Sequence, residues 1–366
     1  MARSDNAAWR PLGITNVFLI LLENHDWAEI KGGVDCPYIN QTLLPAASLA
    51  DHYFTPTNNH PSLPNYLWLV AGTNFGILND SSPVTNTRKT TNHLGWQLDL
   101  AGLTWRSYAE DLPFNVVPLS NVGNYAPRHV PLLYFKNINT NYAYVTNHFR
   151  PFEELARDLD RGTVARFNFI TPNLTNDMHN AVGAVGRRKL GDNWLAKNVP
   201  KILKSDAWKN GGLLMIAWDE GSRGTAEGDE SDGPLGLIVL APTAKGHGYV
   251  NHLHYDHSST LRTIQDIFGL QPYLGAAASS VDLSDLFIPI PQLGFFPDLI
   301  APTHFQVSQS YPGHVYSLEM TGRLGISPWE ETARFIATGT TLNFPVISLS
   351  GTNGPEFRFY RCTVQP

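Results

Sequence analysis

The residues best suited to chemistry lie at positions 59–66, which read Asn-His-Pro-Ser-Leu-Pro-Asn-Tyr. This segment places the hydroxyl of Ser62 between two prolines, with His60 and Asn65 as polar neighbours. Pro64 suits the first turn of a helix, because its missing N–H would have no partner there in any case. Ser62 is therefore predicted at or just before a helix N-terminus, which favours an anion such as phosphate. Taken alone, the segment is more simply interpreted as a proline-rich loop with a capping serine.

Two polar pairs, Glu23-Asn24 and Asp219-Glu220, each come directly after an apolar run. Any one of these acids is explained by solubility at the end of a strand. If they meet at one edge of a sheet, their carboxylates repel one another unless a cation joins them. Carboxylate and amide oxygens are the ligands that Mg²⁺, Ca²⁺ and Mn²⁺ prefer. The pairs therefore indicate a site for a divalent cation.

The chain has 13 histidines among 366 residues, which is many for this length. The densest group lies at residues 252–257, and its spacing matches no familiar metal-binding motif. Asp177 and His179 form a similarly weak signal. A Zn²⁺ site would require more histidine than the two acidic pairs offer, and His60, His179 and His257 could supply it at a second site.

Apolar runs typical of buried strands alternate with stretches of helical spacing. The strand-like runs lie at residues 16–22, 103–108, 166–170, 213–218 and 235–240. The helical stretches lie at residues 65–71, 92–101, 151–160, 191–207 and 258–268. This alternation predicts an α/β fold with a mainly parallel sheet sandwiched by helices. Ligands of such folds bind at the carboxyl ends of the strands, where the polar pairs follow.

The pattern changes near residue 290. Residues 1–290 are predicted as one large domain, residues 291–302 as a proline-rich linker, and residues 303–366 as a small antiparallel β-sandwich module. Strands of this module are expected at residues 305–307, 314–320, 334–337, 346–349 and 357–362.

Composition excludes several classes of partner. The net charge of −6 and the pI near 6.1 give no electrostatic signature of nucleic-acid binding. No apolar run reaches the length of a membrane span, and no signal core is recognisable at the N-terminus. The low content of charged residues, 16%, fits an exported protein in the periplasm or outside the cell.

Cys36 and Cys362 are expected to be unrelated thiols, with an end-to-end disulfide as the alternative.

Five segments, in this order, resemble those of the bacterial phosphoesterase family that holds acid phosphatases and phospholipases C. They are residues 18–25, 59–66, 171–179, 217–221 and 257–264. This family is part of the wider alkaline-phosphatase-like superfamily. The resemblance implies that fold, and it implies that residues 1–290 are a phosphoesterase catalytic domain.

The resemblance also implies a role for each matching residue. Ser62 would be the nucleophile and a metal ligand, together with the ligands Glu23, Asn24, Asp219 and Glu220. The phosphate site or a second metal would involve His60, Asn65, Asp177, His179 and His257. Superfamily members with two zinc ions carry an aspartate on the first strand, where this chain has Glu23-Asn24. That departure favours one cation or an asymmetric pair, whether Mg²⁺, Ca²⁺, Mn²⁺ or Zn²⁺.

The expected activity is metal-dependent hydrolysis of phosphoric esters through a phosphoserine on Ser62, with His60 or His179 protonating the leaving alcohol. The substrate would be a small phosphate ester or a phospholipid head group. A phosphomonoesterase of the acid phosphatase type is favoured over a phosphodiesterase or phospholipase C. Which of these substrates the enzyme accepts is expected to depend on how the loops at residues 73–92, 111–150 and 221–233 close over the site.

Three other functions compete with this one. A sulfatase on the same scaffold normally requires an arginine two residues after the proline of its Ser-x-Pro motif, where this chain has Tyr66. A metal-independent serine acyl hydrolase would be expected to carry a Gly-x-Ser-x-Gly turn around its nucleophile, which Ser62 lacks. A non-catalytic binding protein would have no need to keep Ser62, Glu23 and Asp219.

Overall fold

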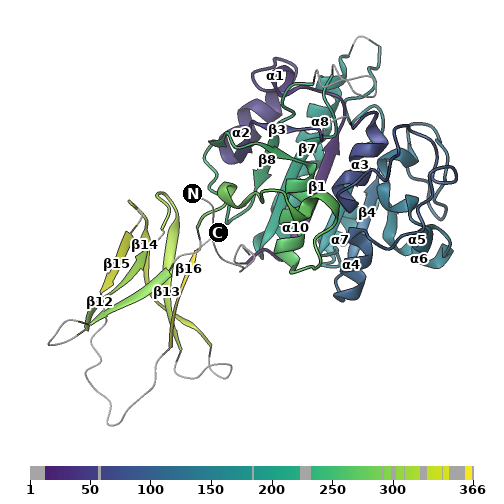
Figure 1. The fold of residues 1–366 in the computed structure, drawn as a ribbon. Helices are drawn as coiled ribbons and strands as arrows, with labels where there is room; N and C mark the ends of the chain where they lie inside the picture. The colour runs from purple at the N-terminus through teal and green to yellow at the C-terminus, as the bar shows by residue number, and fades with distance from the viewer. Residues whose placement is uncertain are drawn as a thin grey trace. The chain divides into compact units, whose positions relative to one another are not determined.

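The computed structural model describes residues 13–56, 59–183, 185–222, 232–289, 292–297, 302–308, 310–321, 328–339, 341–345 and 359–364. The chain divides into two compact units, Met1–Leu286 and Phe287–Pro366. Both units are drawn in Figure 1.

An eight-stranded sheet forms the centre of the first unit, in the order β5-β4-β6-β1-β7-β8-β2-β9 (Figure 1). Its strands are β1 (Asn16–Leu22), β2 (Ser48–Ala50), β4 (Trp105–Ala109), β5 (Phe149–Pro151), β6 (Phe167–Thr171), β7 (Gly212–Trp218), β8 (Leu237–Leu240) and β9 (Tyr249–Asn251). A separate parallel pair is formed by β3 (Tyr53–Phe54) and β10 (Tyr255–Asp256).

The prediction of a mainly parallel sheet is confirmed. Parallel pairing joins β5, β4, β6, β1 and β7, and also β2 and β9. β8 runs antiparallel to both of its neighbours, β7 and β2. A parallel return requires a crossover connection, usually a helix, and the described residues between β7 and β8 form none. Because β8 is antiparallel to both β7 and β2, the strands β2 and β9 run in the same direction as β1 and β7.

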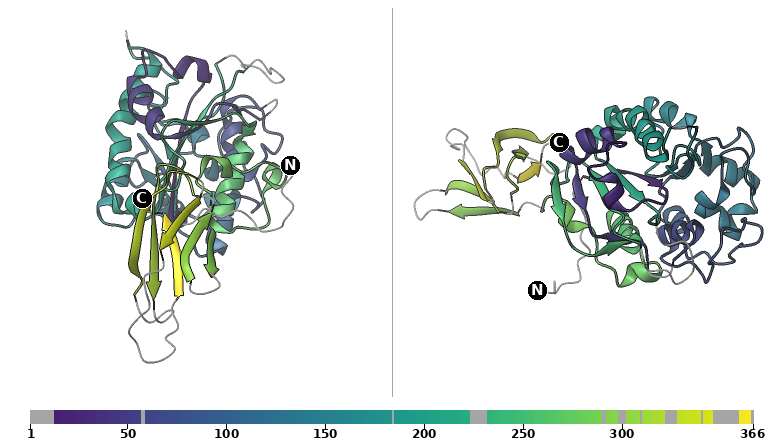
Figure 2. Two further views of the ribbon diagram at one scale, coloured as in Figure 1. Left: turned by 90° about the vertical axis from the view of Figure 1, so that its left-hand side faces the viewer. Right: turned by 90° about the horizontal axis from the view of Figure 1, so that it is seen from above.

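Helices cover both faces of this sheet, with α8 on one side and α3 and α10 on the other (Figure 2). The helices are α1 (Trp27–Ile30), α2 (Leu44–Ala46), α3 (Ser62–Ala71), α4 (Leu94–Leu100), α5 (Lys136–Asn139), α6 (Tyr142–His148), α7 (Glu153–Asp160), α8 (Arg187–Lys204), α9 (Asp206–Lys209) and α10 (His257–Phe268). Short π or 3₁₀ turns are η1 (Ile39–Leu43), η2 (Pro127–His129), η3 (Pro131–Tyr134), η4 (Gly275–Ala278) and η5 (Ser284–Leu286). Within the described residues, no helix has the length and apolar character required to cross a membrane.

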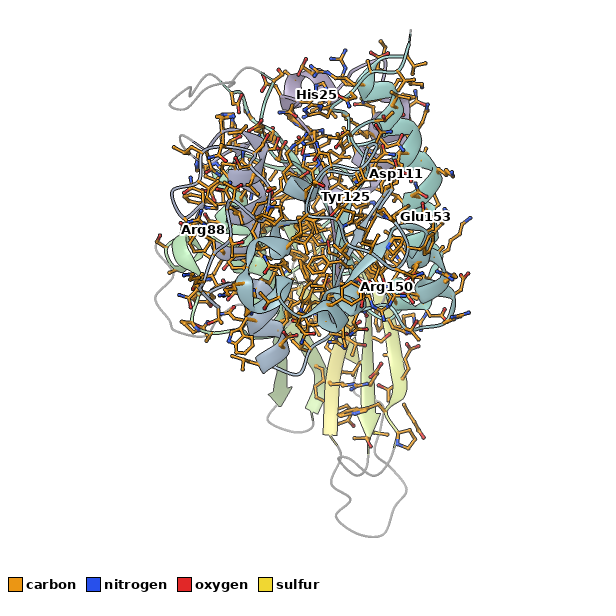
Figure 3. All side chains as sticks on the ribbon, turned by 90° about the vertical axis from the view of Figure 1, so that its right-hand side faces the viewer. His25, Arg88, Asp111, Tyr125, Arg150 and Glu153 are labelled. Atoms are coloured by element: carbon orange, nitrogen blue, oxygen red, sulfur yellow. The ribbon has the colours of Figure 1, made fainter. Side chains whose placement is uncertain are left out.

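The core follows from the apolar runs. In β1 every residue after Asn16 is buried, and all seven residues of β7 are buried. This is typical of strands covered on both faces. The view of the side chains in Figure 3 labels Tyr125, which is 1% exposed, and Glu153, which is exposed at the start of α7.

Helix α3 ends where the backbone requires a glycine. Gly72 adopts a left-handed φ of 67°, and a Cβ at this position would lie 2.2 Å from the carbonyl oxygen of Leu274. Both the conformation and the space therefore exclude a side chain there. The predicted start of this helix at residue 65 is three residues too late, since Ser62 is already its first residue.

The second unit consists of two three-stranded antiparallel sheets, β11-β12-β15 and β14-β13-β16. The strands are β11 (Gln292–Pro297), β12 (Pro302–Ser308), β13 (Val315–Thr321), β14 (Glu330–Ile336), β15 (Thr341–Pro345) and β16 (Phe359–Val364). Their buried side chains form a small core of Phe305, Val307, Tyr316, Leu318, Ala337 and Leu342. The predicted small antiparallel module is therefore present.

Two expectations for the second unit concern the linker and one strand. Strand β11 lies within the residues predicted as a linker, 291–302, and its backbone pairs with β12. The strand expected at 346–349 lies outside the described residues. Cys36 and Cys362 are both free thiols.

Candidate active site

Ser62 is the first residue of α3, and the prediction that it lies at a helix N-terminus is confirmed. Its side chain is buried, with 3% of the residue exposed, and its Oγ donates a hydrogen bond of 2.9 Å to Oε2 of Glu23. The N–H of Leu63 donates to the carboxylate of Asp80 over 2.9 Å. The first turn of α3 thus already attracts a carboxylate, in accord with the positive end of the helix dipole.

The two polar pairs emerge side by side because β1 and β7 are parallel and in register, with Leu22 opposite Trp218. Asn24 connects the pairs. Its backbone N–H lies 3.2 Å from Oδ1 of Asp219, and its Nδ2 donates to Oε1 of Glu220 over 2.7 Å. Asn24 has a φ of 41°, a left-handed conformation that asparagine tolerates better than most residues.

Glu220 holds together the segment around the nucleophile. Its Oε2 accepts hydrogen bonds from Asn65 over 3.1 Å and lies 2.8 Å from Nδ1 of His60. The other ring nitrogen of His60 lies 3.2 Å from Asp232. Burial acts to lower the pKa of His60, but the hydrogen bonds to Asp232 and Glu220 outweigh it and raise the pKa to about 10. His60 is therefore an imidazolium at neutral pH.

A second group of ligand-type side chains surrounds Glu23. Nε2 of His129, in η2, lies 3.1 Å from Oε1 of Glu23, and Nδ1 of His129 lies 3.4 Å from Asp177. Glu23, His129 and Asp177 are all buried, and one ligand atom from each lies within 4.8 Å of the others. The hydroxyl of Tyr66 donates to Oε1 of Glu23 over 2.5 Å.

Two further residues predicted to belong to the site, His179 and His257, both contact one of the buried aspartates. The backbone N–H of His179 donates to Oδ1 of Asp177 over 2.8 Å, and the His179 ring is half-buried. The ring of His257 is engaged at both nitrogens: Nδ1 lies 2.9 Å from the hydroxyl of Tyr53, and Nε2 lies 2.6 Å from the carbonyl oxygen of Asp219. The metal or phosphate role of His257 stays a prediction, and these contacts make it a group that positions Asp219.

The buried carboxyl groups of the site have raised pKa values. Burial, and then repulsion by Asp177, raise the pKa of Glu23 well above its ordinary value. Burial followed by the charge of Glu23 does the same to the pKa of Asp219, and burial is also the main cause of the raised pKa values of Asp177 and Glu220. His60 compensates the charge of Glu220, but the buried carboxyl groups of Glu23, Asp177 and Asp219 cannot all ionise without positive charge beyond that of Arg128.

Two buried oxygen atoms are available to a compensating cation. Oδ1 of Asn24 and Oδ2 of Asp219 have no hydrogen-bond partner within the described part of the chain. The orientation of the Asn24 amide is fixed, because its Nδ2 faces the Glu220 carboxylate and Oδ1 must therefore point the other way. With Glu23 and Ser62 beside them, these are hard oxygen ligands, and the residues present fit a divalent cation.

Four residues of the candidate active site were not predicted from the sequence: Tyr66, Arg128, His129 and Asp232. The side chain of Arg128 is mostly buried, and its charge lowers the pKa of both Glu23 and Asp177. Its Nε lies 3.6 Å from Asp80, which caps α3. Tyr66 stands in the nucleophile segment itself, but nothing in the local pattern separates His129 from the chain's other histidines.

Comparison with known proteins identifies the chain as a phosphoric ester hydrolase. The sequence profile of the Phosphoesterase family matches residues 33–271, more than half of the chain, and the chain belongs to this family. Over 272 residues it is 29% identical to a phosphatidylinositol-3-phosphatase of Mycobacterium tuberculosis, covering 74% of this chain and 82% of that protein. It is 25% identical over 316 residues to a probable acid phosphatase of Kluyveromyces lactis, covering 83% and 69%.

The fold has its own counterpart among solved structures. A protein of the alkaline phosphatase superfamily from Vibrio parahaemolyticus superposes with a TM-score of 0.52 at 10% identity. The superposition covers 82% of this chain and 76% of that one. The alkaline-phosphatase-like fold expected from the sequence is thus confirmed.

Proposed function

We propose that the chain is a metal-dependent phosphomonoesterase that forms a phosphoserine on Ser62. The observation that carries this proposal is the position of the Ser62 hydroxyl, at the N-terminus of α3 and 2.9 Å from Glu23. Glu23 is followed by Asn24, which contacts Asp219, and both of these residues carry a buried oxygen without a hydrogen-bond partner in the described part of the chain. A bound divalent cation would supply charge stabilisation to the serine alkoxide and to the phosphoryl oxygens.

The chain's own residues would share the remaining tasks. Ser62 passes its hydroxyl proton to Glu23, its hydrogen-bond acceptor, and its Oγ bonds to phosphorus as the bond from phosphorus to the ester oxygen breaks. The ester oxygen leaves with a proton from His60 or His179, and water then hydrolyses the phosphoserine. The cationic Arg128 is the proposed contact of the phosphoryl oxygens. Asn65, whose two amide N–H groups already donate to the carbonyl of Asn59 and to Glu220, would hold the nucleophile segment in place.

Glu23, Asn24 and Asp219 are the proposed protein ligands of the cation, together with Ser62. Glu220, first expected as a further ligand, already accepts hydrogen bonds from Asn24 and Asn65 and contacts His60. We therefore assign it chiefly to orienting those groups, a supporting role that often matters nearly as much as ligation. The neighbouring Glu23, His129 and Asp177 group is the candidate for a second cation.

The names of the relatives favour a monoester as substrate, since an acid phosphatase and a phosphatidylinositol-3-phosphatase both remove a terminal phosphate. The proposed substrates are a small phosphate monoester or the phosphorylated head group of a phospholipid. A phosphodiesterase or phospholipase C remains the alternative on the same site, and an exported location in the periplasm or outside the cell remains part of the proposal. Residues 223–231 of the loop expected to influence substrate choice lie outside the described residues.

The contacts of Ser62 weigh against an acyl hydrolase. Such an enzyme requires a histidine within hydrogen-bonding reach of the serine, whereas the acceptor described for Ser62 is Glu23 and both ring nitrogens of His60 face carboxylates. A sulfatase is disfavoured because Tyr66 occupies the place of the expected arginine and binds Glu23.

The test is Ser62→Ala, measured with an aryl phosphate and with ³²P-labelled substrate quenched in acid. We expect hydrolysis to fall on the order of 10³-fold or more, and the wild type, unlike the variant, to carry acid-stable label on Ser62. Ser107→Ala, which removes another buried serine hydroxyl in the middle of β4, is the matched control and should stay active. Undiminished hydrolysis by Ser62→Ala would refute the mechanism.

A further inference from the structure

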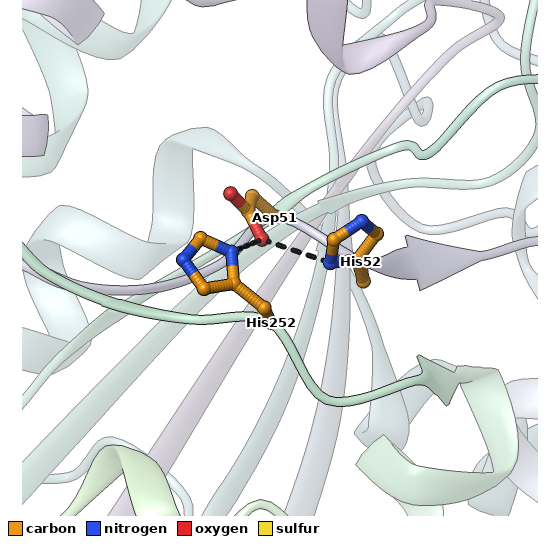
Figure 4. A group of neighbouring side chains, drawn as sticks. All are labelled: Asp51, His52 and His252. Atoms are coloured by element: carbon orange, nitrogen blue, oxygen red, sulfur yellow. Dashed lines mark hydrogen bonds and ion pairs between the residues drawn. The ribbon is translucent and has the colours of Figure 1, made fainter.

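A group of side chains outside the active site also converges on one point: Asp51, His52 and His252 (Figure 4). They come from two short segments that follow β2 and β9. These strands pair in parallel, with Ala50 opposite Asn251, so the two segments leave the sheet side by side.

Both segments are fixed again immediately afterwards, because the next strands also pair. β3 and β10 place Tyr53 opposite Tyr255. Between the two pairings, the N–H of Asp51 donates to the carbonyl of Asn251 over 3.2 Å, and the N–H of Tyr255 donates to the carbonyl of His52 over 2.9 Å. The backbone that carries the three side chains is therefore tied down at both ends.

The ligand-type atoms face a single oxygen. Nδ1 of His252 lies 2.8 Å from Oδ1 of Asp51, and Nδ1 of His52 lies 3.3 Å from the same atom. The two imidazoles are oriented edge to face, with ring centroids 5.7 Å apart. Figure 4 shows both rings directing a nitrogen at the carboxylate from opposite segments.

We propose that Asp51, His52 and His252 bind a transition-metal ion of the zinc type. Two imidazole nitrogens and one carboxylate oxygen are a ligand set suited to Zn²⁺, in contrast to the oxygen ligands around Ser62. Tetrahedral ligands about 2.0–2.1 Å from zinc are separated from one another by roughly 3.3 Å. Nδ1 of His52 already lies 3.3 Å from Oδ1, and Nδ1 of His252, hydrogen-bonded to Oδ1 at 2.8 Å, would move outward slightly on binding. The side chains of His52 and His252 are 48% and 68% exposed, so water can occupy the remaining coordination positions.

The consequence of binding is mechanical support for the active site. Tyr53, the residue after His52, contacts His257, which in turn contacts the carbonyl of Asp219. A metal ion that joins the segments after β2 and β9 would hold the start of this buried chain in place. The site is separate from the proposed catalytic cation and does not depend on it.

The experiment is calorimetric titration of the chelator-treated full chain with ZnCl₂, in wild type, in His252→Gln and in the His52→Gln/His252→Gln double variant. We expect the exposed substitutions to leave the fold intact and to remove one zinc ion per chain. His254→Gln is the matched control, because His254 is an exposed histidine of the same segment whose ring stacks on Phe54 and stands outside the cluster. It should retain the full stoichiometry.

Repeating the titration with Asp219→Asn separates this site from the catalytic one. The surface event should persist in that variant and disappear when His252→Gln is added. Zinc at about 100 times its Kd should raise Tm by roughly 5 °C through this site alone. Equal stoichiometry and affinity in wild type and the double variant, or loss of all zinc binding in Asp219→Asn alone, would overturn the proposal.

Discussion

The imidazole of His129 lies flat against the phenol ring of Tyr66, with ring centroids 4.7 Å apart and an angle of 4° between the planes. Both rings reach the same oxygen, Oε1 of Glu23, at 3.1 Å from Nε2 of His129 and 2.5 Å from the Tyr66 hydroxyl. The other oxygen of Glu23 is thereby directed at Ser62. The stacked pair thus fixes the orientation of the carboxylate that contacts the proposed nucleophile.

Tyr66→Phe should preserve the ring stacking but release Oε1 of Glu23. Because outer groups that orient a metal ligand commonly contribute 10–100-fold, we expect kcat to fall by about that factor while KM changes little. Steady-state kinetics with an aryl phosphate measure this. Tyr134→Phe is the control, since the hydroxyl of Tyr134 is also buried but donates to the carbonyl of Ser81. Equal losses in the two variants would show that Tyr66 acts only through stability.

His129→Gln tests whether the group formed by Glu23, His129 and Asp177 contributes to cation binding. Burial, and then the charge of Arg128, lower the pKa of His129 well below its ordinary value, so the ring is a neutral imidazole with a lone pair available at neutral pH. We expect the apparent affinity of the activating cation to weaken by about 10–100-fold. The measurement is activity against free cation concentration, with His148→Gln as the control, because the half-buried His148 contacts the carbonyl of Trp105 instead. Unchanged cation affinity in His129→Gln would remove His129 from the site.

The sequence was sufficient for those parts of the site that lie next to regular elements. Glu23, Asn24, Asp219 and Glu220 were expected to meet because each pair follows an apolar run, and the register of β1 with β7 brings them together. Ser62 was expected at a helix N-terminus because of the prolines beside it.

The parts that the sequence did not predict are those placed by long-range contacts. His129 reaches Glu23 from a short 3₁₀ turn more than a hundred residues later in the chain, and Asp232 contacts His60 across a still longer stretch of the chain. No periodicity marks such residues, because a single turn of irregular chain carries no repeating burial pattern. The antiparallel direction of β8 was missed for a related reason: an apolar run indicates burial but not direction.

Removal of divalent cations should abolish activity and also destabilise the fold. The reason is that the buried carboxylates of Glu23, Asp177 and Asp219 then repel one another with no cation between them. We expect a chelator to lower Tm at neutral pH by several degrees, corresponding to about 2–3 kcal/mol when the cation was present at about 100 times its Kd.

Asp219→Asn provides the comparison for that experiment. This variant removes one of the repelling charges and one proposed ligand, so its Tm should respond less to the chelator than that of the wild type. Calorimetric scans of both proteins with and without chelator measure the difference. An activity that survives exhaustive chelation would instead favour the acyl hydrolase alternative.

A pH effect is expected at Asp285, a residue of η5 remote from Ser62 in sequence, which anchors β9 from one side. Burial acts to raise the pKa of Asp285, but hydrogen bonds from Tyr249 over 2.5 Å and from Lys245 over 3.0 Å outweigh it and hold the pKa below its ordinary value. A carboxyl group whose pKa is lower in the folded than in the unfolded chain stabilises the fold above the unfolded pKa of about 3.9, and this contribution is lost as the pH falls through the folded pKa.

Asp285→Asn should therefore lower Tm at pH 7, and the difference from wild type should shrink as the pH is lowered below about 4. Because the carboxylate is substantially exposed and solvent screens its charge, we expect the loss at pH 7 to be about 1 kcal/mol, or roughly 2 °C in Tm. Thermal scans of chelator-treated protein at several pH values measure this without interference from bound cations. Asp282→Asn, a change in the same loop, is the control because the side chain of Asp282 accepts a local hydrogen bond from the backbone of Ser284. A difference between Asp285→Asn and wild type that stayed constant from pH 7 to pH 3 would show that its cause is packing, not charge.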